Sequence, residues 1–208
     1  MAIVPNAAVE RKTCRVCLGK SLQKVLSLGS TPPANAFVKD PKQREQFFPL
    51  ELSFCNDCSF VQLTHVVSPE LLFRDYVYVS STSPVFVEHF KSLAETIIKR
   101  FKLQQNSLVV DIGSNDGVLL RPFKNGGMKV LGIDPAEKIA EMATKSGIET
   151  LPVFFTPGVA RDIVKKYGKA KVVTATSVFS HVDGLDSFVE GVKELLDGDG
   201  VFVIEVYY

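Results

Sequence analysis

The sequence predicts an α/β fold in which a parallel sheet is covered by helices on both faces and preceded by a small cysteine-bearing module. Two observations lead to this prediction. From residue 107 onward, short and almost wholly apolar runs alternate with stretches whose apolar residues recur at helical spacing. All four cysteines lie before residue 60, in a part of the chain with little helical periodicity. Apolar strands alternating with helices indicate a parallel sheet that is buried on both faces.

Composition and charge disfavour several classes of protein. The 208 residues suffice for one domain of ordinary size, or for one domain and a small module. The formal net charge is +1, whereas nucleic-acid binders usually carry a basic excess. No apolar run approaches the roughly 20 residues of a membrane span, and the first residues do not resemble a secretory signal. We therefore expect a cytoplasmic protein that binds neither membranes nor nucleic acid.

The chain is expected to divide into three parts. Residues 1–67 form the cysteine-bearing module, residues 68–84 a bridging segment, and residues 85–208 the α/β domain. The bridge contains Ser68 followed by Pro69, which is typical of the start of a helix, so a short helix is predicted there.

The α/β domain is expected to start with an amphipathic helix, because apolar residues from Phe86 to Phe101 recur at helical spacing. Strands and helices then alternate along the chain. The predicted strands are 108–112, 130–133, 150–154, 172–176 and 201–206, and the predicted helices are 118–124, 136–146, 158–167 and 185–196.

The cysteines form two pairs, Cys14 with Cys17 and Cys55 with Cys58, separated by 37 residues. Two residues between two thiolates allow both sulfurs to reach one ion, and two such pairs complete the closed four-thiolate site typical of structural zinc. A redox pair is the alternative, but it would be expected as a single pair at a strand–helix junction. His65 is a weaker alternative ligand. We therefore expect these four cysteines to bind Zn²⁺.

The stretch 107-SLVVDIGSNDGVLL-120 predicts a strand, a tight turn and the start of a helix, a layout that binds nucleotide-like cofactors. A dinucleotide loop needs closely spaced glycines, and here Asn115 stands where a further glycine would be expected. Asn115 can adopt the left-handed conformation that glycine would otherwise supply. Carboxylates at Asp111 and Asp116 would repel a pyrophosphate and favour S-adenosylmethionine, which carries a sulfonium and an ammonium group. The alternative for both carboxylates is ordinary turn and cap chemistry. The predicted cofactor-binding residues of the loop are Asp111, Gly113, Ser114, Asn115, Asp116 and Gly117.

Asp134, in 131-LGIDPA-136, ends the second predicted strand of the α/β domain. An acid at this position can accept hydrogen bonds from both ribose hydroxyls of a bound cofactor. This feature serves NAD and S-adenosylmethionine equally, so it adds Asp134 to the predicted cofactor site without separating the two cofactors.

Seven stretches across the chain together resemble one family. They are 14-CRVC-17, 28-LGSTPPANAF-37, 55-CNDCSFVQL-63, 75-DYVYVSSTS-83, 111-DIGSNDGVLL-120, 132-GIDPA-136 and 177-SVFSHVDGLDSF-188. On these stretches the chain resembles the sugar C-methyltransferases of deoxysugar biosynthesis, which use S-adenosylmethionine on nucleotide-linked keto-sugars. The resemblance implies a Rossmann-like class I methyltransferase core, with strands one to five present, behind a zinc-binding module.

The resemblance also implies roles for single residues. Tyr76 and His181 match active-site residues near the reacting sugar, for which dTDP is the expected nucleotide. C-methylation beside a ketone needs a base that removes a carbon-bound proton and a donor that stabilises the enolate oxygen. His181 follows the fourth predicted strand, at the edge of the sheet where ligands bind in such folds. The alternatives are a capping or solvent-exposed role for His181 and domain packing for Tyr76; His89 is expected to be structural.

The sequence also departs from the family pattern. Ser177 stands where the family commonly has asparagine, and family members are about twice as long. After strand five they add two strands and a C-terminal domain that begins with a Tyr-His-Glu-His-like stretch, whereas this sequence runs to 201-VFVIEVYY-208. Strand five would then be an open sheet edge. We therefore expect a fragment, a split gene product or a chain that needs a partner, and a module that binds zinc and S-adenosylmethionine without turnover is the alternative function.

Two further classes remain as competitors. One is an NAD-linked enzyme, which the missing glycine of the loop disfavours. The other is a zinc-ribbon nucleic-acid binder, which the nearly neutral charge disfavours.

Overall fold

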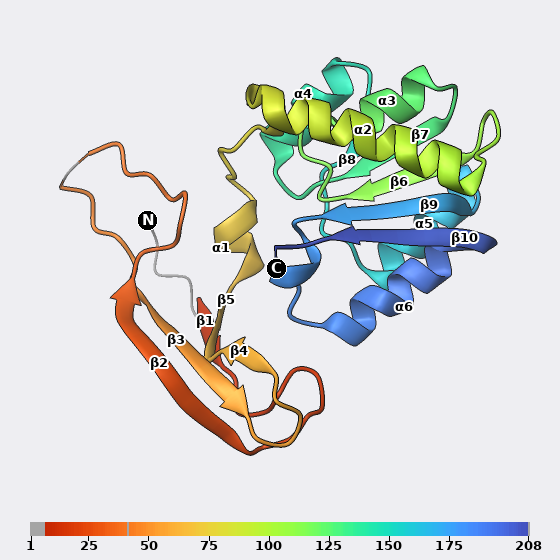
Figure 1. Ribbon diagram of the computed structural model, residues 1–208. Helices are drawn as coiled ribbons and strands as arrows, with labels where there is room; N and C mark the ends of the chain where they lie inside the picture. The colour runs from red at the N-terminus through yellow and green to blue at the C-terminus, as the bar shows by residue number, and fades with distance from the viewer. Residues whose placement is uncertain (1–6, 41, 208) are drawn as a thin grey trace. The chain divides into compact units, whose positions relative to one another are not determined.

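The computed structural model describes residues 7–40 and 42–207. The chain divides into two compact units between Val77 and Tyr78, a point inside the segment 68–84 that was predicted as a bridge. Figure 1 shows the elements of both units, which are described separately.

The first unit, whose sequence shows little helical periodicity, contains two small antiparallel sheets. One sheet pairs β1 with β5, and the other has the strand order β2-β3-β4. A short helix, α1, begins at Pro69 directly after Ser68, as predicted. The bounds are β1 Ala8–Glu10, β2 Leu22–Thr31, β3 Phe48–Cys55, β4 Val61–Leu63, β5 His65–Val67 and α1 Pro69–Phe73.

The second unit is built on a five-stranded parallel sheet with the strand order β10-β9-β6-β7-β8. The predicted α/β fold with a parallel sheet is therefore confirmed. The strands are β6 Leu108–Ile112, β7 Lys129–Ile133, β8 Thr150–Leu151, β9 Ala170–Thr176 and β10 Leu196–Glu205. The helices are α2 Pro84–Phe101, α3 Leu120–Asn125, α4 Glu137–Lys145, α5 Pro157–Tyr167 and α6 Leu185–Leu195, with 3-10 turns at Ser80–Thr82 and Phe179–His181.

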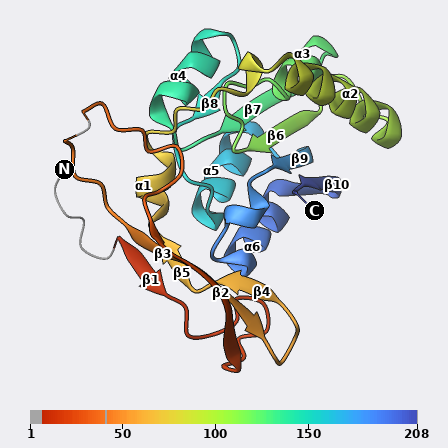
Figure 2. The ribbon, with the colours of Figure 1, turned by 60° about the vertical axis from the view of Figure 1, so that its left-hand side comes forward.

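Helices cover both faces of this sheet, as Figure 2 shows. Successive residues of a strand point to opposite faces, so neighbours on β6 belong to different clusters of buried side chains. Val109 packs with Phe90 of α2 and Phe123 of α3. Val110 packs with Ile163 of α5 and Val192 of α6. Burial on both faces explains why the strands read as continuous apolar runs in the sequence.

Local chemistry sets the ends of several elements. The Ser83 side chain accepts a hydrogen bond from the Phe86 amide, so it caps α2 ahead of Pro84. β8 was predicted to extend to residue 154 but ends at Leu151, because Pro152 has no amide hydrogen for the strand ladder.

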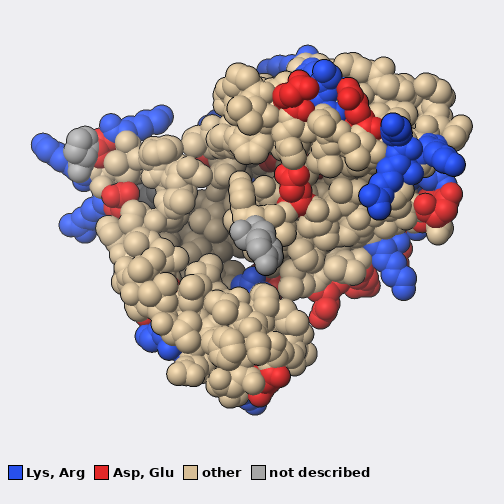
Figure 3. All heavy atoms as spheres, viewed as in Figure 1, with Lys and Arg blue, Asp and Glu red and all other residues tan. Residues whose placement is uncertain are grey.

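Charge is distributed unevenly on the surface. On the face drawn in Figure 3, Lys, Arg, Asp and Glu are interspersed over the second unit, whereas much of the first unit's surface on that face is uncharged. None of the helices in the described ranges combines the length and hydropathy that a membrane crossing requires.

Candidate metal centre and cofactor site

The four cysteines come together in the first unit. Their sulfur atoms all lie within 4.8 Å of one another. The Cys14–Cys58 and Cys17–Cys55 sulfur pairs are each 3.6 Å apart. A tetrahedral zinc with bonds of about 2.3 Å holds its sulfurs roughly 3.8 Å apart, so the donor set and its spacing fit this ion. The Gly19 amide also points at Cys17 Sγ, at 3.4 Å, which suits a thiolate.

The two cysteine pairs sit in turns of the same geometry. Leu18 follows the first pair with φ of 61° and Ser59 follows the second with φ of 63°, both in the left-handed region. In each turn this residue donates its amide to the carbonyl of the first cysteine, Leu18 to Cys14 at 3.0 Å and Ser59 to Cys55 at 2.8 Å. The repeated turn presents both cysteines of a pair on the same side of the backbone.

The long segment between the pairs is closed by the antiparallel strands β2 and β3. Their register places Leu22 opposite Cys55, so the start of β2, just after the first pair, lies beside the end of β3. The Asn56 amide donates to the Ser21 carbonyl at 2.9 Å and continues this pairing into the second turn. The 37 residues between Cys17 and Cys55 thus bring the two pairs together.

The side chain of Gln62, on β4, holds the backbone of the first cysteine turn through two hydrogen bonds. Its side chain is 4% exposed. Its Oε1 accepts from the Arg15 amide at 2.8 Å, and its Nε2 donates to the Thr13 carbonyl at 3.1 Å. Because these two residues flank Cys14, the buried amide fixes the backbone on both sides of a predicted metal ligand.

The thiols differ in acidity. Burial opposes ionisation of Cys14, yet hydrogen bonds from the backbone amides of Cys17 and Val16 outweigh it and lower its pKa to about 7. His65, the alternative ligand, lies on β5 with Nδ1 at 2.9 Å from the Thr64 hydroxyl. It is not part of the group of close ligand atoms that the structure shows among its described residues.

In the second unit, the turn after β6 alternates left-handed residues. Gly113, Asn115 and Gly117 have φ of 72°, 50° and 79°. Asparagine at the middle position therefore takes the conformation predicted for it. The amides of Gly113 and Ser114 both donate to the Ile133 carbonyl, at 2.7 and 3.2 Å, so the turn is anchored to the end of β7.

Asp134 lies where β7 meets this turn. Its carboxylate accepts from the Asn115 amide at 2.8 Å and from the Ala136 amide at 2.9 Å, and the residue is 7% exposed. Burial raises its pKa, while the two amide hydrogen bonds act in the opposite direction. Each carboxylate oxygen has a second acceptor position, so ribose hydroxyls could still bind to this group.

Asp111 is buried inside the sheet, with 1% of its surface exposed. Its carboxylate accepts from the Thr174 hydroxyl of β9 at 2.6 Å. Burial raises the pKa of Asp111 to about 7; the hydrogen bond from Thr174 opposes the shift and the nearby charge of Asp134 adds to it. A ligand at the turn would therefore meet the charge of Asp111 only where this carboxyl is ionised, above about pH 7.

Two buried polar atoms of the turn have no hydrogen-bond partner in the described structure, Ser114 Oγ and Asp116 Oδ1. A Cβ added to Gly132 would lie 2.4 Å from Ser114 Oγ, so this hydroxyl faces β7. Asp116 is 5% exposed, and an unpaired buried carboxylate oxygen is costly unless a cation or donor meets it. The turn thus fits a positively charged ligand better than a phosphate.

The side chain of Asn115 is used in a way that the sequence did not predict. Its Nδ2 donates to the Tyr78 carbonyl at 2.9 Å, and its Oδ1 accepts from the Ser80 amide at 2.9 Å. The predicted cofactor residue therefore holds the backbone of the segment that precedes α2.

The loop after β9 carries His181 to the same edge of the sheet. Val178 lies against the cofactor turn, because a Cβ on Gly113 would come within 2.2 Å of its Cγ2. Ser177 has φ of 55° and donates its amide to the Glu205 carbonyl at 2.7 Å. His181 ends the 3-10 turn of this loop and is exposed. The structure thus brings the loop of His181 beside the turn that contains Gly113.

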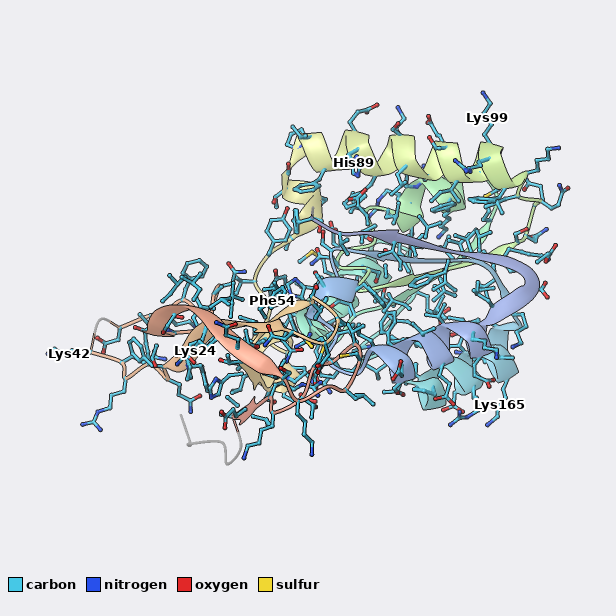
Figure 4. All side chains as sticks on the ribbon, turned by 60° about the horizontal axis from the view of Figure 1, so that its bottom comes forward. Lys24, Lys42, Phe54, His89, Lys99 and Lys165 are labelled. Atoms are coloured by element: carbon cyan, nitrogen blue, oxygen red, sulfur yellow. The ribbon has the colours of Figure 1, made fainter. Side chains whose placement is uncertain are left out.

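Tyr76 and His89 are the other two residues with a role predicted from the sequence. Tyr76 belongs to the first unit, where its ring centroid is 6.1 Å from that of Phe73. His89, expected to be structural, lies near the start of α2 in Figure 4, and its Nε2 is 2.7 Å from a carboxylate oxygen of Glu205. Glu205 ends β10, so this pair joins α2 to the sheet.

Comparison with known sequence families matches both units. Residues 86–208, more than half of the chain, match the family described as "Methyltransferase domain". The chain belongs to this methyltransferase family. Residues 14–73 match a second family, described as "Putative zinc binding domain", and this match includes all four cysteines.

Individual relatives agree with this assignment. The C-methyltransferase NovU of Streptomyces niveus is 36% identical over 197 residues, which cover 94% of this chain and 47% of NovU. A ubiquinone biosynthesis O-methyltransferase of Pelagibacter ubique is 27% identical, over 59% of this chain and 52% of the relative. The chain therefore spans about half the length of these relatives. Among solved structures, DesVI of Streptomyces venezuelae superposes with a TM-score of 0.44 at 19% identity, over 59% of this chain and 51% of DesVI.

Proposed function

We propose that the second unit binds S-adenosylmethionine at the turn after β6 and serves methyl transfer to carbon. The observation that carries the proposal is the convergence of buried carboxylates on one turn: Asp111, Asp116 and Asp134 are each less than 10% exposed. Such a site repels phosphates and attracts a cation. In this arrangement Asp134 accepts the ribose hydroxyls, Asp116 faces positive charge, and Asp111 adds negative charge from inside the sheet.

The proposed substrate is a nucleotide-linked keto-deoxysugar, with dTDP as the nucleotide. Support comes from the resemblance in sequence and from NovU, a relative named as a C-methyltransferase. His181 takes the proton from the carbon beside the ketone, and the electron pair moves onto the oxygen as an enolate. Bound S-adenosylmethionine, held by Asp134 and the turn after β6, would supply the methyl group to the enolate carbon and would leave as a neutral thioether. Tyr76 is proposed to orient the sugar.

The cysteine cluster is proposed to hold a structural Zn²⁺ through Cys14, Cys17, Cys55 and Cys58. Four thiolates saturate the ion, so no position remains for a catalytic water. Free thiols that serve as metal ligands persist in a reducing compartment, which supports the cytoplasm as the proposed location.

Titration calorimetry separates the cofactor classes. Wild-type chain is expected to bind S-adenosylhomocysteine and S-adenosylmethionine and to give no heat with NAD. Asp134→Ala is expected to weaken this binding at least tenfold, because two ribose hydrogen bonds are lost. Tight NAD binding without a response to S-adenosylmethionine would overturn the proposal.

Transfer of a radiolabelled methyl group to dTDP-linked keto-sugars tests the reaction itself. His181→Ala is expected to retain cofactor affinity and to lose transfer by roughly 10²-fold or more, as for a general base. His89→Ala serves as a control, since His89 is paired with Glu205 and has no proposed role in proton transfer. Cofactor binding without any transfer would instead support a binding module that needs a further domain or a partner for turnover.

A further inference from the structure

Asn115 is hydrogen-bonded to two separate segments of the second unit. Its own amide donates to Asp134 at the end of β7. Its side-chain amide pairs with the backbone of Tyr78 and Ser80 as a second backbone strand would, with one donor and one acceptor, both at 2.9 Å. Only 8% of the residue is exposed, so these hydrogen bonds are shielded from water.

The segment that Asn115 holds leads directly into α2. The Thr82 hydroxyl donates to the Val79 carbonyl at 2.7 Å and closes the 3-10 turn Ser80–Thr82. Ser83 then caps α2, whose buried residues Phe90 and Ala94 pack on the sheet. The end of this segment is therefore fixed by the core, whereas its start is fixed by a side chain of the cofactor turn.

A turn needs only a positive φ at this position, and glycine would supply that at no steric cost. Asparagine adds a two-point hydrogen bond that exists only when the turn and the segment 78–80 are both in place. Any ligand that orders the turn must then also order this segment, since the same residue belongs to both arrangements.

We propose that Asn115 is a positioning residue that links occupancy of the cofactor turn to the conformation of residues 78–83. Cofactor binding fixes Asn115 and Asp134 together, and Asn115 passes this order to the backbone of Tyr78 and Ser80. The proposal rests on the proposed function only for the identity of the ligand. The hydrogen bonds of Asn115 do not depend on that identity.

Three variants test the link. Asn115→Gly keeps the positive φ and removes both side-chain hydrogen bonds. Asn106→Gly is the matched control, because Asn106 is also left-handed, with φ of 64°, but is exposed in the loop before β6. Asn115→Asp keeps the acceptor for Ser80 and places a carboxylate oxygen against the Tyr78 carbonyl.

Hydrogen exchange of the ligand-free protein gives the first readout. Amides of residues 79–83 are expected to exchange roughly 30-fold faster in Asn115→Gly, since two hydrogen bonds of about 1 kcal/mol each are lost, and to be unchanged in Asn106→Gly. Equal exchange in the two variants would overturn the link, whether or not the protein binds S-adenosylmethionine.

Affinity for S-adenosylhomocysteine gives the second readout. Asn115→Gly is expected to bind roughly tenfold more weakly than Asn106→Gly, and ligand is expected to protect residues 79–83 in the wild type and in Asn106→Gly but not in Asn115→Gly. Faster exchange with unchanged affinity would show a purely structural contact and overturn the positioning role. If the wild type does not bind this ligand, the proposed function fails and the exchange result alone decides the link.

The pH dependence of Asn115→Asp gives the third readout. Protonation of the new carboxyl group restores a donor to the Tyr78 carbonyl. The loss of affinity relative to wild type at the same pH is therefore expected to shrink as the pH is lowered from about 8 to about 5.5. Wild type is measured at each pH because the neighbouring carboxylates of Asp111, Asp116 and Asp134 belong to the same site. A deficit that does not change with pH contradicts the assignment of Nδ2 as the donor.

Discussion

The two units of the chain are stabilised in different ways. In the second unit, aliphatic and aromatic residues of the helices and strands form two buried clusters, one on each face of the sheet. In the described part of the first unit, the only buried residues of apolar type are Cys14 and Cys55. Every residue of β2 between its two ends is exposed, including Val25, Leu26 and Leu28.

This difference indicates that the role of zinc is to stabilise the first unit. A unit without a buried aliphatic core gains little from the hydrophobic effect and needs another source of free energy. A four-thiolate ion supplies it by joining two turns that the sequence separates. The second unit needs no such ion, because its core comes from the same residues that define its strands.

Removing zinc is expected to have the largest effect, confined to the first unit. Chelation, or Cys55→Ser, should abolish ordered structure in β2 and β3, because structural zinc contributes on the order of 10 kcal/mol in small modules. Hydrogen exchange by mass spectrometry would show this together with zinc content. Amides of β6 serve as the internal control, and simultaneous loss of protection in β6 would break the comparison.

Asp111→Asn is expected to give the next largest effect, in the second unit. Between the ordinary pKa of 3.8 and the raised pKa of about 7, the folded chain holds a proton on Asp111 that the unfolded chain has released. Stability therefore falls as pH rises through this window, and it stays lower above it. The variant keeps an acceptor for Thr174 and removes the charge, so it should be about 2–4 kcal/mol more stable at pH 8.

Denaturant unfolding at several pH values would measure this gain, with the exposed Asp162→Asn on α5 as the control. Wild-type stability that does not decline between about pH 4 and pH 7 relative to Asp111→Asn would argue against a protonated Asp111. The same variant should bind S-adenosylmethionine more weakly, since the site loses negative charge.

Gln62→Ala tests whether buried polar contacts replace a core in the first unit. Loss of its hydrogen bonds to the backbone beside Cys14 should cost about 1–3 kcal/mol and speed the loss of zinc to a chelator. Gln104→Ala is the matched control, because the Gln104 amide also donates to a backbone carbonyl, at 2.9 Å from Lys102, but is exposed. Equal zinc retention in both variants would show that the hydrogen bonds of Gln62 do not stabilise the zinc site.

Ser177→Asn is expected to give the smallest effect, a gain in the second unit. Serine at φ of 55° carries a strain that asparagine tolerates better, so the variant should be about 0.5–1 kcal/mol more stable. Thermal unfolding measures it, and Ser187→Asn in the helix α6 is expected to be neutral or slightly destabilising. A loss of stability at Ser177 would show that the loop after β9 prefers serine for another reason.

How much the sequence predicts differs between the units in the same way. β6 was predicted with its observed bounds, because its short and almost wholly apolar run is typical of a strand that is buried on both faces. β2 was missed, since its exposed residues show no pattern of burial that a sequence could reveal. The gathering of the four cysteines was predicted from their spacing alone, and the left-handed Asn115 from its place in the turn. Its partners Tyr78 and Ser80 are 37 and 35 residues away, so only the folded chain shows them.

The pairing of β2 with β3 also predicts an order of assembly for the first unit. An ion captured by one cysteine pair has two ligands and must wait for the other pair to arrive. Closing a loop of this length costs entropy, which successive contacts between β2 and β3 offset. We therefore expect Leu22 to pair with Cys55 before the ion is fully coordinated. Metal uptake should then follow the rate of hairpin formation and not the concentration of zinc once the first pair is filled.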